Sequence, residues 1–421
     1  MKAGPQGSTW TWQLTTGTKR SGNRRHFSRG GYPTKKDAEA ALAGALAAMN
    51  KGDTRPLMRV ETIPLGDYLE QWLDSRKDSL KPKTYAGYRD AIRTWIAPRD
   101  PVDRWRSAPH LGAIPMFDLG PDQILGLYAH LRERGGMVTK AERKAAELAK
   151  REPIGKPLGT RSVQLAHTIL RMALADAAES GRLQFAPTER IPRRQRPKHT
   201  ARNQADRFWT PEQTMLFLRA RSDDRLFPLW ATEIDTGARR GEQSGLKWED
   251  LDLGAGQATI RENRVLVDGE VIEGTTKTSK TRAVRLDRRT VTALKRWKTR
   301  QAQERMAAGS AWVGGVPGQA GYLWTDELGA PYRPDRLSDF FEQAQAGLDL
   351  TRLVFHGLRH TSATIALARL VPVHVVSARL GHANVSITWN LYAHVIPGQD
   401  GDAAAAIGDA IYEAAGTEAQ A

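Results

Sequence analysis

The chain has 421 residues, of which 40% are hydrophobic and 26% charged, a length that at roughly 100 to 200 residues per domain predicts several globular domains. No apolar run approaches the roughly 18 residues of a membrane span and cysteine is absent, which excludes a membrane protein, disulfides and cysteine-based zinc sites. Its 63 Lys and Arg exceed its 47 Asp and Glu, for a net charge of +16. A polyanionic partner is therefore expected, with charge that only aids solubility as the alternative.

The first 60 residues carry much of this charge, with 11 Lys and Arg against three acidic residues. They begin without an apolar stretch behind a basic leader, so a cytoplasmic protein is expected. Alternation around Trp10 and Trp12, broken by Gly17 and residues 21–23, predicts two or three short strands. Thr34 is a typical N-cap for an alanine-rich helix over residues 35–49.

The pattern becomes helical from about residue 63. Apolar residues recur at helical spacing in four segments, the last of which has Gly181 as its C-terminal stop. These segments are residues 65–73, 84–95, 122–134 and 160–180. The polar stretch 135–158 either extends a helix or forms a mobile insertion.

Residues 190–207 contain seven basic residues, one acidic residue and two prolines. This composition predicts a basic linker that follows DNA phosphates, with a solvated connector as the alternative. Thr210 then caps a further helix, and residues 257–286 are rich in strands around an Asp268-Gly269 turn.

Four segments of the last half concentrate residues that bind phosphate or transfer protons. They are residues 236–242 (TGARRGE), 277–280 (KTSK), 356–360 (HGLRH) and 380–392, from LGH to Tyr392. Two guanidinium groups can hold the nonbridging oxygens of a phosphodiester and spread the charge that grows in the transition state. The segments therefore predict displacement at a phosphodiester without a metal.

Spacing within these segments supports the prediction. His356 and Arg359 are three residues apart at the start of a predicted helix, so they share one face. Glu242 is three residues after Arg239 and is placed to hold that arginine in register. Tyr392 is the candidate nucleophile, since the chain has no cysteine and no serine in a Gly-x-Ser-x-Gly turn. Its phenol has a pKa near 10 and needs a base or nearby cations.

The segments resemble those of the tyrosine recombinases, in particular phage-type integrases of actinobacterial phages and integrative elements. The family pattern TGxRxxE is matched by residues 236–242, and HxxRH by residues 356–360. LGH followed ten residues later by the nucleophile is matched by His382 and Tyr392. The hairpin lysine of the family corresponds to Lys277 or Lys280.

This resemblance implies a mostly α fold with small antiparallel sheets (α+β), in a three-domain integrase architecture that forms a C-shaped clamp on DNA. Residues 1–55 resemble an arm-type DNA-binding domain, a three-stranded sheet plus a helix, and residues 62–187 a helical core-binding domain. A basic interdomain linker, 188–207, leads to the catalytic domain, 208–396. A C-terminal tail, 397–421, follows.

The tail contains Ile407 and Ile411 four residues apart among alanines. This spacing indicates either an amphipathic helix that docks on a neighbouring protomer or a frayed acidic terminus.

The resemblance also implies roles for the site residues. Arg239 and Arg359 clamp the scissile phosphate, and Tyr392 becomes esterified to it. His356 and His382 hydrogen-bond the phosphate or accept the phenolic proton, and Lys277 protonates the departing 5′ oxygen. Glu242 and His360 are expected to support this set. DNA contacts are expected from Arg20, Arg24, Arg25, Arg193, Arg194, Arg196 and Lys198.

The expected function is that of a site-specific DNA recombinase that integrates or excises a phage genome or mobile element and needs no cofactor. Its expected partners are double-stranded attachment sites, copies of itself in a tetramer on DNA, a DNA-bending host factor and an excisionase, all in the cytoplasm of a bacterial host. Two alternatives are a nicking enzyme similar to type IB topoisomerases and a DNA-binding regulator without catalysis.

Overall fold

The structure is a computed structural model in which contacts divide the chain into two compact units, Met1–Thr200 and Ala201–Ala421. The residues that it describes are 10–18, 24–32, 34–50, 63–98, 111–136, 138, 140–151, 155–183, 185–198, 208–275, 281–392 and 400–414. Both the expected arm region and the expected helical region lie in the first unit, so their separation into two domains stays a prediction.

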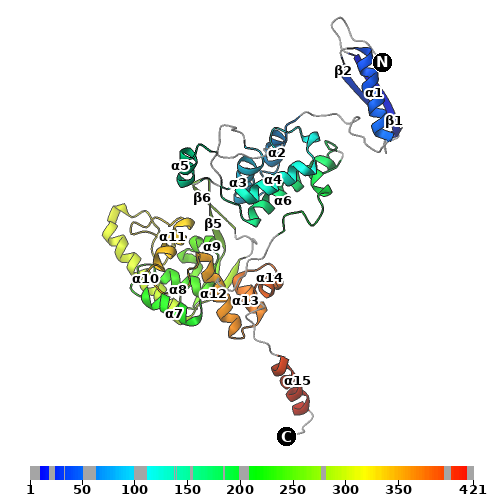
Figure 1. The fold of residues 1–421 in the computed structure, drawn as a ribbon. Helices are drawn as coiled ribbons and strands as arrows, with labels where there is room; N and C mark the ends of the chain where they lie inside the picture. The colour runs from blue at the N-terminus through cyan, green and yellow to red at the C-terminus, as the bar shows by residue number, and fades with distance from the viewer. Residues whose placement is uncertain are drawn as a thin grey trace. The chain divides into compact units, whose positions relative to one another are not determined.

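The N-terminal part is a β-hairpin with one helix (Figure 1). Strand β1 (Trp10–Thr18) pairs antiparallel with β2 (Arg24–Tyr32), and α1 (Lys35–Asn50) follows. The predicted cap is present, since the backbone N–H of Asp37 donates to Thr34 Oγ1 at 3.2 Å. The buried indole of Trp12 packs against Ala45 of the helix. Among the described residues this region has two strands rather than the three of an arm-type sheet.

The remainder of the first unit is helical, as expected. Its helices are α2 (Leu65–Asp74), α3 (Pro82–Ala91) with a π-helical turn (Ile92–Ile96), α4 (Pro121–Arg134), α5 (Lys140–Leu148) and α6 (Thr160–Glu179). The apolar faces of α2, α4 and α6 meet in one core. Of the alternatives for residues 135–158, the described part contains a separate short helix, α5, and not an extension of α4.

The first half of the expected linker belongs to this helical core. A 3-10 turn (Pro187–Arg190) contacts α4 and α6, and Ile191 after it is 1% exposed. Arg196 donates from Nε to the carbonyl of Ile191 at 2.8 Å, so its side chain folds back on the chain. Arg193, Arg194 and Lys198 are exposed.

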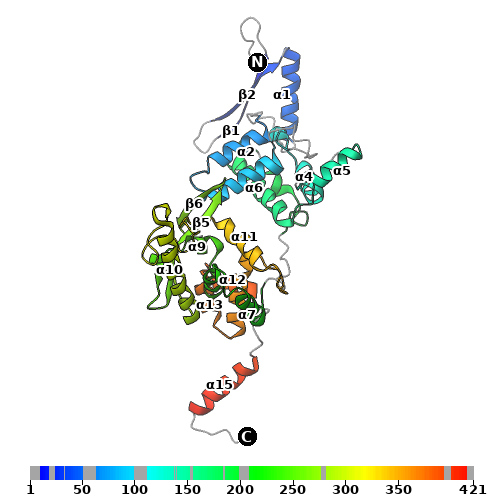
Figure 2. The ribbon, with the colours of Figure 1, turned by 90° about the vertical axis from the view of Figure 1, so that its left-hand side faces the viewer.

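The second unit has α8 (Phe227–Thr236) at its centre. This helix contacts α7 (Pro211–Ala220), α10 (Arg288–Ala308) and α12 (Phe355–Ala368) (Figures 1 and 2). The other helices of the unit are α9 (Arg240–Gly245), α11 (Pro334–Ala344), α13 (Val373–Leu380), α14 (Val385–Tyr392) and α15 (Asp400–Ala414). Trp209, Phe217, Trp230 and Phe341 fill the core around α8.

The second unit also contains small antiparallel sheets. Strands β3 (Leu251–Asp252), β4 (Gln257–Ile260) and β7 (Arg282–Arg285) form one sheet, and β5 (Glu262–Val267) pairs with β6 (Glu270–Thr275) in a hairpin. The hairpin turns at Asp268 and Gly269, both at positive φ, as the Asp-Gly pair predicts. The mostly α fold with small antiparallel sheets is thus confirmed.

Candidate active site

Two arginines from distant segments are held by the ends of two helices. Helix α8 ends at Gly237 and α13 ends at Gly381, with φ of +57° and +66°. Arg359 donates to the carbonyl of Gly237 at 2.6 Å and to that of Leu380 at 2.8 Å. Arg239 donates to the carbonyl of Gly381 at 3.2 Å. Because a helix C-terminus carries partial negative charge, these two ends attract both guanidinium groups to one place.

A buried carboxylate fixes the first arginine. Glu242 is 0% exposed, and its Oε1 accepts from Arg239 Nη1 at 2.7 Å. Its Oε2 accepts from the backbone N–H of Arg239 at 2.9 Å and from Arg282 Nη2 at 2.7 Å. Burial raises the pKa of Glu242, but the hydrogen bond and charge of Arg282, together with Arg239, outweigh this and hold it at about 2. Glu242 is therefore ionised, as expected of a supporting residue.

The second arginine is also perturbed by its surroundings. Arg359 is 2% exposed, and burial, followed by the charge of Arg239, lowers its pKa to about 10. It therefore stays charged at neutral pH. Arg239 and Arg359 both donate to carbonyls at the end of α13, and two guanidinium groups gathered in this way can bind the oxygens of an anion.

The histidines of the set lie around these arginines. Burial, followed by the charge of Arg359, lowers the pKa of His382 to about 4. Its Nδ1 lies 2.7 Å from Thr388 Oγ1. His356 keeps an exposed face, yet the desolvation of its ring and the neighbouring His360 lower its pKa to about 4. Both rings are thus neutral at pH 7 and each has one N–H to donate.

Tyr392 ends α14 and lies against α12. Its ring is 3% exposed, and its hydroxyl lies 2.7 Å from Nδ1 of His360. The ring of His360 also meets that of His356 edge to face, with centroids 5.1 Å apart. Burial raises the pKa of Tyr392 to about 12, against the opposite effect of Arg359. The direct partner of the phenol is therefore His360, which the sequence indicated only as a supporting residue.

The structure brings together Arg239, Glu242, His356, Arg359, His360, His382 and Tyr392. Other candidate residues are not part of this cluster as described. Lys277 and Lys280 lie between β6 and β7, outside the described residues, as does Arg20. Arg24 and Arg25 lie on β2, with only their backbone described.

The sequence does not single out Arg282 as a site residue. It begins β7, within residues 257–286, where the sequence predicts strands. This strand contains two arginines, Arg282 and Arg285, and nothing in their spacing shows which one contacts Glu242.

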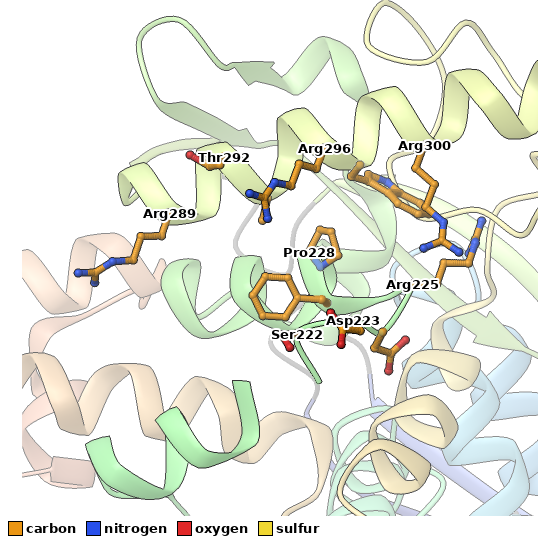
Figure 3. Close-up of a pocket in the computed structure, with 12 residues that line it drawn as sticks. Ser222, Asp223, Arg225, Pro228, Arg289, Thr292, Arg296 and Arg300 are labelled. Carbon is orange, nitrogen blue, oxygen red and sulfur yellow. The ribbon is translucent and has the colours of Figure 1, made fainter. Parts of the chain in front are cut away.

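A separate cavity of about 400 Å³ lies between the segment that precedes α8 and one face of α10 (Figure 3). Arg289, Arg296 and Arg300 line it together with Phe227 and Pro228. None of the residues that line this cavity belongs to the cluster. Within the described part of the chain, no three His, Asp or Glu side chains are grouped so that they could hold a metal ion. Among the same residues, no helix has the length and hydrophobicity of a membrane span.

The chain is similar to known phage integrases and tyrosine recombinases. Residues 213–398 match the phage integrase family, and residues 65–99 match the SAM-like N-terminal domain of phage integrases. A tyrosine recombinase XerC-like protein of Caldanaerobacter subterraneus subsp. tengcongensis is 26% identical over 389 residues, which are 89% of this chain and 90% of that protein.

Two solved structures show the same fold. The Tn1549 transposon integrase, in complex with a circular intermediate DNA, has a TM-score of 0.60 at 15% identity and covers 82% of this chain and 99% of its own. A lambda integrase tetramer bound to a Holliday junction has a TM-score of 0.53 at 14% identity and covers 92% of this chain and 94% of its own.

Proposed function

The chain belongs to the phage integrase family of tyrosine recombinases, and we propose that it recombines DNA by forming a 3′-phosphotyrosyl bond through Tyr392. The observation that carries this proposal is the cluster itself. Arg239 and Arg359 donate to carbonyls at the ends of α8 and α13. The hydroxyl of Tyr392 contacts His360 on α12, the helix that also carries Arg359.

In the proposed reaction Tyr392 Oη attacks the phosphorus, so that an O–P bond forms and the bond from phosphorus to the 5′ oxygen breaks. The phenolic proton passes to a base, and the 5′ oxygen takes up a proton from Lys277, or from Lys280. The 5′ hydroxyl of a partner strand then attacks the ester and releases the tyrosine. Each broken bond is replaced by another of the same kind, so neither step requires ATP.

Arg239 and Arg359 would hold the nonbridging oxygens during this displacement. In the free protein some N–H groups of each arginine donate to backbone carbonyls and to Glu242, which fixes the orientation of both guanidinium groups. A phosphate that binds here meets donors that are already placed, and preorganised charge of this kind is usually the largest catalytic contribution.

The three histidines have two proposed roles, proton acceptance and hydrogen bonding to the phosphate. His360 is the proposed acceptor of the phenolic proton, because its Nδ1 is the group in contact with the Tyr392 hydroxyl. His356 and His382 are neutral at pH 7 and would each donate one hydrogen bond to the phosphate.

The other partners follow from the family. We propose that the chain acts on double-stranded attachment sites as a tetramer, with a DNA-bending host factor and an excisionase as accessory proteins. Residues 1–55 would bind arm sites, and residues 62–187 would close a clamp on the core site with the catalytic domain. Ile407 and Ile411 of α15 are 61% and 59% exposed, which suits a helix that docks on a neighbouring protomer.

A nicked suicide substrate tests the chemistry. Wild type in EDTA should form a covalent protein–DNA complex that accumulates, because the short 5′ fragment diffuses away. Tyr392→Phe should form none, and His360→Phe should form it more slowly. A complex that persists in Tyr392→Phe would remove Tyr392 from the mechanism. Relaxation of supercoiled DNA without strand exchange would instead favour the topoisomerase-like alternative.

A further inference from the structure

We infer that Arg282 is a positioning residue. By pairing with Glu242, it keeps that carboxylate from neutralising the positive charge with which Arg239 binds the scissile phosphate. This inference rests on the proposed function. It starts from an imbalance of charge in the cluster, where one buried carboxylate, Glu242, lies between two guanidinium groups.

Arg282 is tied to the cluster on two sides. Its side chain is only 9% exposed, and its Nη2 donates to Glu242 Oε2 at 2.7 Å. Its Nε donates to the carbonyl of Arg379, near the end of α13, at 2.9 Å. Arg282 thus joins the start of β7 to the carboxylate and to the helix end that hold Arg239.

Arg282 also occupies the space beside Gly381. A Cβ atom on Gly381 would lie 2.7 Å from Arg282 Nη1, so the guanidinium packs directly on this turn. The carbonyl of Gly381 is the second acceptor of Arg239. Arg282 therefore binds Glu242 directly and packs on the turn whose carbonyl also orients Arg239.

The charge argument follows from these contacts. With both arginines present, the group Arg239, Glu242 and Arg282 carries a net charge of one positive unit. Without Arg282, Arg239 and the ionised Glu242 would form a neutral pair in a buried place, where charges interact strongly. The attraction of Arg239 for a phosphate would fall even though Arg239 itself is intact.

The test compares cleavage of the nicked substrate by four proteins: wild type, Arg282→Gln, the double variant Glu242→Gln with Arg282→Gln, and Arg282→Lys. Arg282→Gln should cleave up to about 100-fold more slowly, because a small misplacement of a catalytic group can cost this much. The double variant should recover part of this loss, because Arg239 is no longer neutralised by a carboxylate. Arg282→Lys should lie between wild type and Arg282→Gln.

A second measurement uses a neutral methylphosphonate at the scissile position. The ratio of the cleavage rates of wild type and Arg282→Gln should be smaller on this substrate, because the scissile group no longer carries the negative charge that attracts Arg239. Arg379→Gln is the matched control: it removes the pairing of Arg379 with Asp235 beside the same strand and leaves Glu242 untouched, so any defect should be equal on both substrates.

Several outcomes would overturn the inference. They are an unaltered rate in Arg282→Gln, a double variant no faster than Arg282→Gln, or the same ratio of wild-type to Arg282→Gln rates on the two substrates. If Arg282→Gln fails to fold, as judged by circular dichroism, the cleavage rates of Arg282→Lys on the two substrates test the inference. Arg282→Lys should then be slower than wild type on the phosphodiester and closer to wild type on the methylphosphonate. Wild type without any covalent complex would instead contradict the proposed function.

Discussion

At the scale of single residues, burial decides what each member of the site can do. Glu242 is ionised because two arginines outweigh its desolvation, whereas His382 is neutral because nothing compensates its desolvation. The phenol of Tyr392 is neutral because its desolvation outweighs the opposing charge of Arg359, and it keeps its proton until a base removes it. The residue types alone give none of these protonation states.

Replacing Arg359 with Ala should abolish cleavage while most DNA affinity remains. A donor aimed at the charge of the transition state is worth about 3 to 4 kcal/mol, whereas DNA affinity is spread over many phosphates. Single-turnover cleavage and equilibrium binding to the same core site measure the two effects. Parallel losses of binding and cleavage would show that Arg359 only binds DNA.

His382 should make the protein less stable in weak acid. Its folded pKa, about 4, is below the value of about 6.5 expected when unfolded, so the unfolded chain binds more protons between these values. Stability is therefore lost as pH falls from about 6.5 to 4, and is unaffected by this group above that range. The Tm of His382→Asn should fall less steeply across this window than that of wild type. Equal slopes for His382→Asn and wild type would contradict the assignment.

At the scale of elements, the site is made by helix ends. Gly237 and Gly381 adopt the left-handed conformation that ends α8 and α13, and the carbonyls there accept from the two arginines. Asp235, near the end of α8, accepts from Arg379 of α13 at 2.8 Å. The two helices are thus joined close to the arginines, which keeps the pocket rigid.

Gly381→Ala should lower both stability and cleavage. A left-handed residue with a Cβ costs about 1 to 2 kcal/mol, and here the Cβ would also lie 2.7 Å from Arg282 Nη1. Gly347→Ala is the control, because φ at Gly347 is +76° but a Cβ there would meet nothing within 4 Å. Chemical denaturation should show a loss in both variants, and the cleavage assay only in Gly381→Ala. Unimpaired cleavage by Gly381→Ala would refute the role of this turn.

At the scale of the whole molecule, charge is distributed unevenly. The first 60 residues hold 11 Lys and Arg against three acidic residues, while residues 395–421 hold five acidic residues and no basic one. A basic end suits binding to phosphates that is independent of the catalytic pocket. This asymmetry supports the proposal that residues 1–55 bind DNA at sites of their own.

Deleting residues 1–55 should impair recombination between full attachment sites more than cleavage of a short core site. The reason is that the deletion leaves the catalytic cluster of the second unit intact while removing the region proposed to bind arm sites. Recombination assays on DNA with and without arm sites measure this difference. Equal activity of the full and truncated chains on arm-containing DNA would refute the role of this region.

The sequence alone determined the parts of this protein that depend on local physics. Thr210 and Gln213 form a capping box at the start of α7, and Asp268-Gly269 forms the hairpin turn, because these bonds and dihedral angles join near neighbours in the chain. The residue types of the site were also evident from their order in four short segments.

Only the tertiary structure decided which of these residues meet. His360 lies 32 residues from its partner Tyr392, Arg282 lies 40 from Glu242, and Arg239 lies 142 from Gly381. No periodicity or spacing carries information across such separations, because these contacts depend on how α12, α13 and β7 pack around α8. Burial, and with it the charge of each group, exists only once that packing has formed.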